Sequence, residues 1–190
     1  MLSSITPLGE RGRNRNWLVT VSFFGVGAVL AGAAVFGLTG WVGEAIGLPG
    51  QVWWVAVGLV GVALIADIAG IRPPGPRRQV DENWLGRYRG WVIGLGYGMQ
   101  LGSGFATIVP AFASWALLVL AALSGPVPGI LTGIAFGIGR SLLLFTGGRI
   151  TNTNALAARM SLFNRWQRTA AWGGGIAQGV MVLLLLGAFT

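Results

Sequence analysis

Two ionisable residues lie inside long apolar runs of this 190-residue chain, where a charge needs a specific reason to be present. Arg140 stands nine positions before Arg149, roughly 13 Å along a helix, and Asp67 stands five positions before Arg72, roughly 8 Å along a helix. These depths predict an ion pair between Asp67 and Arg140; alternatively, each side chain reaches interfacial water separately. A pair would act as a structural clamp, which we favour, or as a proton or anion site that opens when one partner is displaced.

A polar stripe along residues 91–122 is the second candidate site. Its members recur at spacings of three and four residues, which places them on one face of a helix. Either the stripe packs against other helices, since hydroxyls commonly bond across helices in membranes, or it lines a path for a solute. The stripe consists of Gln100, Ser103, Thr107, Pro110 and Ser114.

Glycine recurs at every fourth position in two of the apolar runs. Small residues at this spacing let the backbones of two membrane helices approach closely. We therefore predict tight helix packing at Gly94, Gly98, Gly102, Gly129, Gly133 and Gly137.

The missing residue types exclude much chemistry. The chain contains no cysteine and no histidine, so thiol relays, disulfides, thiolate metal sites and imidazole catalysis are absent from it. Asp67, Arg140 and hydroxyl groups make a poor set for acid–base catalysis. We expect no enzyme activity, no catalytic residue, no bound metal and no cofactor.

The composition predicts an all-α, polytopic integral membrane protein. The chain is 54% hydrophobic and only 9% charged, and it lacks enough polar side chains to cover a soluble domain. A single transmembrane domain over residues 17–190 follows a basic cytoplasmic segment at 1–16. A membrane-spanning helix needs about 20 apolar residues. About five spans are predicted, at 17–40, 52–71, 91–122, 129–148 and 171–189.

The arginines predict the orientation of these spans. Twelve of them fall in three polar stretches, 1–16, 72–90 and 149–168, which alternate with nearly uncharged connections. Basic loops remain on the cytoplasmic side. We therefore expect a bacterial cytoplasmic (inner) membrane protein with its N-terminus inside and its C-terminus outside. The arginines set orientation and do not bind nucleic acid.

The predicted third span is too long for one straight crossing. Its 32 residues would extend roughly 48 Å as a helix, against about 30 Å of hydrocarbon. Pro110 and the small residues Gly102, Ser103 and Gly104 weaken the helix between them. We predict that this span tilts, bends or breaks between Gly102 and Pro110, and that the break is buried or lines a cavity.

The order of features over Trp91–Phe189 resembles the transmembrane domain of the CcdA/DsbD family, thiol-redox and cytochrome c biogenesis membrane proteins within a group of small-solute exporters. Residues 102–110, GSGFATIVP, resemble its proline-broken helix, and residues 133–140, GIAFGIGR, resemble its next helix. The segment 159–168 resembles its last connection. The resemblance implies a broken-helix scaffold of six spans in two inverted halves, of which this chain lacks the first helix, and a reactive cysteine near Thr107, where this chain has none.

Three functions fit these observations. We favour a non-catalytic membrane subunit or assembly factor that packs against partner helices in a larger complex. The alternatives are a small-solute or ion carrier with a polar path along the third span, and a degenerate CcdA/DsbD-like protein without thiol chemistry. The expected partners are the lipid bilayer and other membrane subunits or a second copy of the chain.

Overall fold

The computed structural model describes residues 5–47, 53–75, 83–106, 111–158 and 161–162. All regular elements in these ranges are helices, which confirms the all-α prediction. In chain order they are α1 (Pro7–Gly12), α2 (Trp17–Ala45), α3 (Trp53–Ile68), α4 (Trp84–Arg87), α5 (Gly90–Gly102), α6 (Ala113–Ser124), α7 (Pro126–Phe145) and the 3-10 helix η2 (Thr146–Arg149). Residues 153–158 and 161–162 are also helical.

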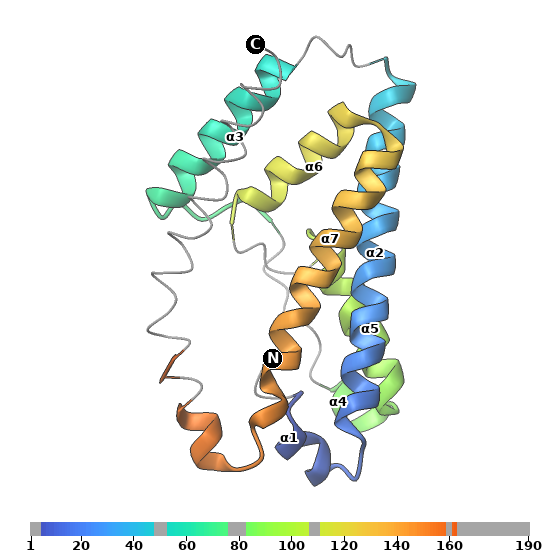
Figure 1. Cartoon of the computed structure of the whole chain (residues 1–190), viewed down its shortest axis with the longest axis vertical. Helices are drawn as coiled ribbons and strands as arrows, with labels where there is room; N and C mark the ends of the chain where they lie inside the picture. Colours follow the sequence, from blue (N-terminus) through green and yellow to red (C-terminus); the bar gives the residue numbers. More distant parts are fainter. Residues whose placement is uncertain (1–4, 48–52, 76–82, 107–110, 159–160, 163–190) are drawn as a thin grey trace.

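Helix α2 is the centre of the bundle and follows its long axis (Figure 1). It packs against α7 along most of its length, against α5 along its N-terminal half, and against α6 near its C-terminal end. Helices α5 and α6 run in the same direction as α2, whereas α7 runs back. Helix α3 packs on α6 and stands to one side of this group.

The predicted third span consists of two helices in the structure. Helix α5 ends at Gly102, Gly104 takes a φ of +81°, and α6 begins at Ala113. The interruption predicted after Gly102 is therefore present, although Thr107 and Pro110 lie outside the described residues. With 13 and 12 residues, α5 and α6 are roughly 20 and 18 Å long. Helix α5 covers the N-terminal half of α2, and α6 covers the C-terminal half.

The other predicted spans shift at their ends. Helix α2 continues to Ala45, five residues beyond the predicted 17–40, and α3 is shorter than 52–71. Helix α7 begins three residues before 129–148, because Gly125 adopts a φ of +88° and Pro126 follows it at the first helical turn. The predicted span at 171–189 lies outside the described residues.

Residues 5–16, within the predicted basic segment at 1–16, fold against the long helices. Thr6 caps α1 by accepting the Gly9 N–H at 3.1 Å, with Pro7 in the first turn. Asn16 caps α2 by accepting the Leu18 N–H at 3.0 Å. Ile5, just before α1, is fully buried in a cluster with Leu85 of α4 and residues of α2, α5 and α7. Residues 5–16 thus belong to the bundle.

Helix α2 presents mostly small residues to the bundle and large apolar residues to the surroundings. Its buried positions are mostly glycine and alanine: Gly27, Ala28, Ala31, Gly32, Gly37, Gly40 and Gly43, with Thr20, Val21, Phe24 and Phe36. Its exposed positions include Leu18, Val26, Leu30, Leu38, Trp41 and Val42. A helix of a soluble bundle shows the reverse arrangement.

Two helices in the described ranges are long and apolar enough to cross a membrane, judged by length and composition alone. They are Trp17–Ala45 and Pro126–Gly148. The helices Trp54–Ile68 and Ala113–Ser124 are apolar but shorter.

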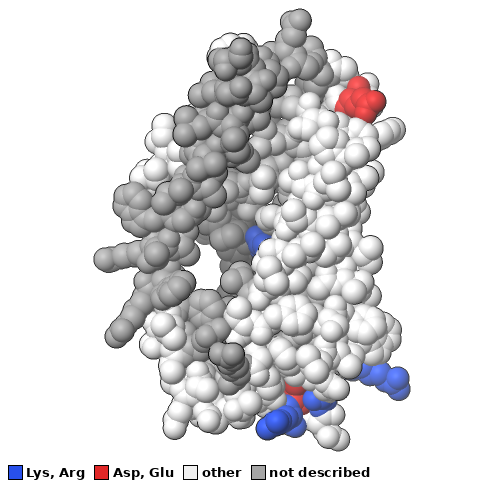
Figure 2. Space-filling model, viewed as in Figure 1, with Lys and Arg blue, Asp and Glu red and all other residues white. Residues whose placement is uncertain are grey.

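Charge is divided between the two ends of the molecule. Figure 2 shows basic side chains gathered at the end where α1 and α4 lie, which carries Arg11, Arg13, Arg87 and Arg89. Acidic atoms stand at the opposite end, where Glu44 occupies the last turn of α2. The long sides between the ends are almost free of charge in this view.

Candidate functional site

The six predicted packing glycines all lie against α2, and we call this contact the glycine seam. It is made by Gly94, Gly98 and Gly102 of α5 and by Gly129, Gly133 and Gly137 of α7. A Cβ atom added at any of them would collide with main-chain atoms of α2. On the α5 side, the atoms met belong to Thr20, Phe24 and Ala28. Each step of four residues along α5 matches a step of four residues along α2, so the two helices stay in contact over this whole stretch.

The α7 side of the glycine seam contains glycine on both helices. A Cβ at Gly133 would meet the carbonyl of Gly32 and, at 2.8 Å, the Ala33 nitrogen. A Cβ at Gly32 would in turn meet the carbonyl of Gly133. The contacting atoms are backbone, so no side chain is able to rotate away. Only glycine fits at these positions while the two helices keep this distance.

Ala28 is where the three helices meet. Its side chain is fully buried, and both Gly102 and Gly137 approach its main chain. The glycine seam thus brings α5 and α7 together at the carbonyl group of one residue of α2. Such close contact gains dispersion energy without large side chains, which is how helices associate where lipid surrounds them.

Asp67 binds the first turn of α6. Its Oδ1 accepts the Phe112 N–H at 2.7 Å and its Oδ2 accepts the Ala113 N–H at 3.1 Å. These N–H groups have no partner within the helix, and a carboxylate also favours the positive end of the helix dipole. Trp115 adds a bond from its Nε1 to the Pro74 carbonyl at 2.9 Å. The end of α3 therefore holds the start of the second half of the broken span.

Arg140 lies on α7 over an aromatic ring. Its guanidinium carbon is 4.9 Å from the ring centroid of Phe136, one turn earlier, and the side chain is half-buried. The next residue, Ser141, lies beside Gly25 of α2. Arg140 is therefore at a level of the bundle away from the ends of both α2 and α7. The contacts seen for Asp67 and Arg140 are with other groups, so their pairing stays a prediction.

The polar stripe is partly visible. Ser103 and Ser114 are buried, and Gln100 is half-buried. The Ser103 hydroxyl donates to the Gln100 carbonyl at 2.8 Å and accepts the Ala106 N–H at 3.2 Å, so it terminates α5 locally. Two described members of the stripe are therefore packed in protein, and Thr107 and Pro110 lie outside the described residues.

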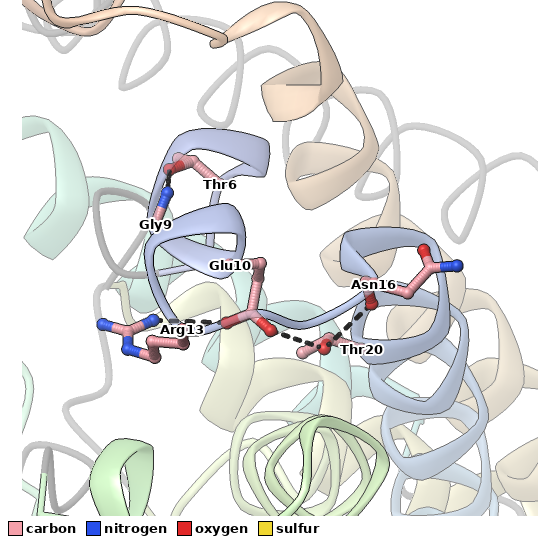
Figure 3. A network of polar contacts seen from close by, with 6 residues as sticks. All are labelled: Thr6, Gly9, Glu10, Arg13, Asn16 and Thr20. Atoms are coloured by element: carbon pink, nitrogen blue, oxygen red, sulfur yellow. Dashed lines mark hydrogen bonds and ion pairs between the residues drawn. The ribbon is translucent and has the colours of Figure 1, made fainter.

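A buried carboxylate ties α1 to α2 and α5 (Figure 3). Glu10 is fully buried; its Oε1 lies 3.2 Å from Arg13 Nη1, and its Oε2 accepts the Thr20 hydroxyl at 3.0 Å. A Cβ at Gly90 would lie 2.6 Å from the Thr20 hydroxyl oxygen and 3.6 Å from Glu10 Oε2, so the start of α5 sits on this network. The positive end of α5 stabilises the carboxylate.

Sequence reasoning missed the Glu10 network because it treated residues 1–16 as a basic segment that sets orientation. Two signals were present: Thr6 followed by Pro7 begins a helix, and Glu10 precedes Arg13 by one helical turn. Neither signal predicts that the carboxylate is buried, because its partner Thr20 belongs to the next helix.

The described residues offer few groups for catalysis. No group of three or more metal-binding side chains occurs among them. Asp67 and Glu10 each accept hydrogen bonds that join helices, and Arg140 lies against a ring. Their arrangement positions helices and does not converge on a substrate-sized site. The predictions of no metal, no cofactor and no enzyme activity stay predictions.

Curated relatives of the chain are named methylamine utilization protein MauF. The chain is 33% identical over 150 residues to that of Paracoccus versutus, an alignment that covers 74% of this chain and 54% of the relative. It is 29% identical over 198 residues to that of Paracoccus denitrificans, with 99% of this chain and 69% of the relative covered. The relative in Methylophilus methylotrophus is also 29% identical over 198 residues, with 97% and 68% covered.

The chain is shorter than the relatives that it matches. The chain spans about half the length of the first relative and about two thirds of the other two. No family model matches the chain, and no solved structure matches it.

The relatives correct the resemblance drawn from the sequence. The assignment to the CcdA/DsbD family was wrong, and so were the thiol-redox and cytochrome biogenesis functions derived from it, because the matching proteins are MauF proteins. The small-solute carrier was wrong on the same finding. The features that suggested the family, a proline-broken helix and glycine at every fourth position, serve close helix packing in membrane proteins in general.

Proposed function

We propose that this chain is an integral membrane protein that takes part in methylamine utilization, the process for which its MauF relatives are named. We propose further that it acts by packing against partner proteins, without chemistry of its own. The name of the relatives supports the process, and their alignments extend along 74% to 99% of this chain. The structure supports the mode of action, because in the described residues the helices pack closely at glycines and the carboxylates of Asp67 and Glu10 join helices.

The observation that carries the membrane location is the reversed arrangement of α2. Glycine and alanine line its contacts with α5 and α7, whereas leucine, valine and tryptophan face outward. Large apolar side chains cannot be left in water over a whole helix, but they are at no disadvantage in lipid. Helix α3 supports the same conclusion, since Trp54, Val62 and Ile65 are each at least 64% exposed.

The charged ends support an orientation. Arg11, Arg13, Arg87 and Arg89 lie at the end where α1 and α4 lie, and the nearly uncharged side of the bundle seen in Figure 2 separates them from Glu44. Basic residues are retained on the cytoplasmic side of a bacterial membrane. We therefore assign the α1 end to the cytoplasmic side of the inner membrane, with five spans: α2, α3, the α5–α6 pair, α7 and the span predicted from the sequence at 171–189. The C-terminus then lies on the outer side.

The absence of catalysis is part of the proposal. In the ranges that the structure describes, the buried ionisable groups are used to join helices: Asp67 holds α6, and Glu10 holds α2 beside α5. A protein that works in this way presents its outer helix faces to partner helices. The glycine seam keeps those faces in fixed positions.

Complementation tests the function. A strain of Paracoccus denitrificans without its MauF is given this chain, and growth on methylamine is measured together with the amount of chain in the membrane fraction. We expect growth to be restored by the natural chain and lost with Gly133→Leu, which separates α7 from α2. A chain that is present in the membrane but restores no growth would refute the proposed function.

The matched control for this experiment is Gly58→Leu. Gly58 lies on the exposed side of α3, and a Cβ there meets nothing within 4 Å. This variant adds the same side chain to an apolar helix without disturbing the bundle. Growth should remain at the natural level.

A further inference from the structure

Two buried donors lack an acceptor at the basic end of the bundle. They are Nη1 of Arg15 and Nε1 of Trp17, which form no hydrogen bond within the part of the chain that the structure describes. Nearly all buried polar groups in proteins are hydrogen-bonded, so each exception needs an explanation. Both atoms carry N–H groups, and one of them belongs to a cation. The missing partner is therefore rich in acceptor oxygens and negatively charged.

The carboxylates of the described residues are engaged elsewhere. Glu10 already binds an arginine and a threonine, and Asp67 accepts two N–H groups at the start of α6. Glu44 stands at the opposite end of α2. In the described ranges, none of these carboxylates is a partner for Nη1 of Arg15.

The surroundings of Arg15 are positive. Its Cδ would lie 3.6 Å from a Cβ at Gly90, so its side chain runs beside the start of α5. Helix α5 begins without a side-chain cap, and the residue before it, Arg89, is exposed. The first N–H groups of a helix carry partial positive charge. Figure 2 shows further basic side chains at this end. An anion beside Arg15 thus meets favourable potential from several groups.

Aromatic side chains at the same end are typical of a membrane interface. Tyr88 and Trp91 are exposed on either side of Arg89, and Trp17 is the first residue of α2. Amphipathic rings of this kind favour the level of the lipid headgroups. The cytoplasmic leaflet of a membrane is rich in anionic lipids, which attract arginine close to the surface. The anion that fits this level of the bundle is a lipid headgroup.

We propose that Arg15 and Trp17 bind the headgroup of an anionic phospholipid. Phosphate oxygens accept the guanidinium N–H groups, and a phosphate or ester oxygen accepts the indole N–H. Both side chains are half-buried, so part of each reaches the surface where a headgroup lies. A planar guanidinium binds phosphate through two parallel hydrogen bonds, which gives the site more than its charge. The inference rests on the proposed membrane location and adds a ligand to it.

Native mass spectrometry of the purified full chain tests the proposal. The chain in detergent is titrated with phosphatidylglycerol and, separately, with phosphatidylcholine, which has the same phosphate but no net charge. The fraction of chain with one bound lipid gives each Kd. We expect phosphatidylglycerol to bind about tenfold more tightly, as one charge-assisted hydrogen-bonded contact implies. Excess inorganic phosphate should not displace it, because the acyl chains hold the lipid against the apolar side of the bundle.

Single substitutions separate a built site from a basic surface. Arg15→Gln should weaken phosphatidylglycerol about tenfold, and Arg15→Lys, which keeps the charge but loses the fork, should weaken it less. Trp17→Phe keeps an aromatic ring but loses the donor, and should weaken it about threefold. The matched control is Arg11→Gln, which removes the same charge from an exposed arginine at the same end and should change the Kd by less than about twofold. Circular dichroism checks that each variant is folded.

Three results would overturn the inference. Equal affinities for the two lipids would mean that no anion is selected. Equal losses for Arg15→Gln and Arg11→Gln would mean a diffuse attraction to the basic end. Displacement of phosphatidylglycerol by inorganic phosphate would assign the two donors to a soluble anion. Flotation of the chain with phosphatidylcholine vesicles is measured separately: a chain that does not float refutes the proposed membrane location, whereas a chain that floats without a lipid preference refutes this inference alone.

Discussion

Replacing Gly133 by alanine tests the glycine seam at its tightest point. The new Cβ would lie 2.8 Å from the Ala33 nitrogen and closer still to the carbonyl group of Gly32. Non-bonded carbon atoms pack at about 3.5–4.0 Å, so α7 has to move away from α2 by roughly an ångström. Because the contacting atoms are backbone, the displacement spreads to Gly129 and Gly137.

The magnitude follows from two opposing effects. Overpacking of this kind costs about 1–3 kcal/mol, and loss of contact along the rest of the seam puts Gly133→Ala at the upper end of that range. Alanine in place of glycine favours the helix by about 1 kcal/mol. We expect a net loss of about 2 kcal/mol in the free energy of unfolding. Gly139→Ala is the control, since its Cβ meets nothing within 4 Å, and it should gain up to about 1 kcal/mol.

The assay is unfolding of the detergent-solubilised chain by sodium dodecyl sulfate, followed by far-UV circular dichroism. The two variants each add one methyl group to the same helix, so the effects of the added methyl group on detergent binding cancel. The reasoning is refuted if Gly133→Ala is as stable as the natural chain. It is also refuted if Gly139→Ala loses as much stability as Gly133→Ala.

Three further predictions use the same unfolding assay. Thr20→Val removes the hydroxyl that donates to the buried Glu10 and should cost about 1–3 kcal/mol, whereas Thr39→Val removes a hydroxyl that bonds only its own helix at Val35 and should cost less; equal losses would argue against a special role for Glu10. Asp67→Ala should cost about 0.5–2 kcal/mol through loss of the α6 cap, with Asp67→Asn intermediate because one acceptor oxygen remains; no difference between Ala and Asn would contradict the cap. Trp115→Phe keeps the apolar ring but loses the bond to the Pro74 carbonyl, and should cost about 0.5–1.5 kcal/mol; an unchanged midpoint would show that this bond adds nothing.

Local patterns predicted the helices well, because the relevant physics acts within a few residues. Long apolar runs have to satisfy their backbone internally, and Gly102 with the small residues after it ends α5 where the sequence indicated. The glycine spacing likewise indicated which helix faces approach closely. It did not indicate that both sets of glycines share α2 and meet at Ala28, because spacing on one helix does not specify its neighbour.

The contacts of charged groups were harder to predict, since they depend on which helices become neighbours. Depth along the chain suggested that Asp67 faces Arg140, and that pairing stays a prediction. It did not indicate that the break in the third span leaves N–H groups at Phe112 and Ala113, for which Asp67 is the acceptor. The burial of Glu10 depends on Thr20 and on the start of α5 at Gly90. No periodicity within residues 1–16 carries that information.

Labelling of the two ends of the bundle tests the central claim, that the chain crosses the inner membrane with its basic end in the cytoplasm. The natural chain has no cysteine, so single cysteines at Gly12 in α1 and at Ser124 at the end of α6, both exposed, report the two ends. A membrane-impermeant thiol reagent is applied to spheroplasts before and after permeabilisation. The account predicts that Ser124→Cys reacts in intact spheroplasts and that Gly12→Cys reacts only after permeabilisation; reaction of Gly12→Cys with Ser124→Cys protected, or recovery of the chain in the soluble fraction, would contradict it.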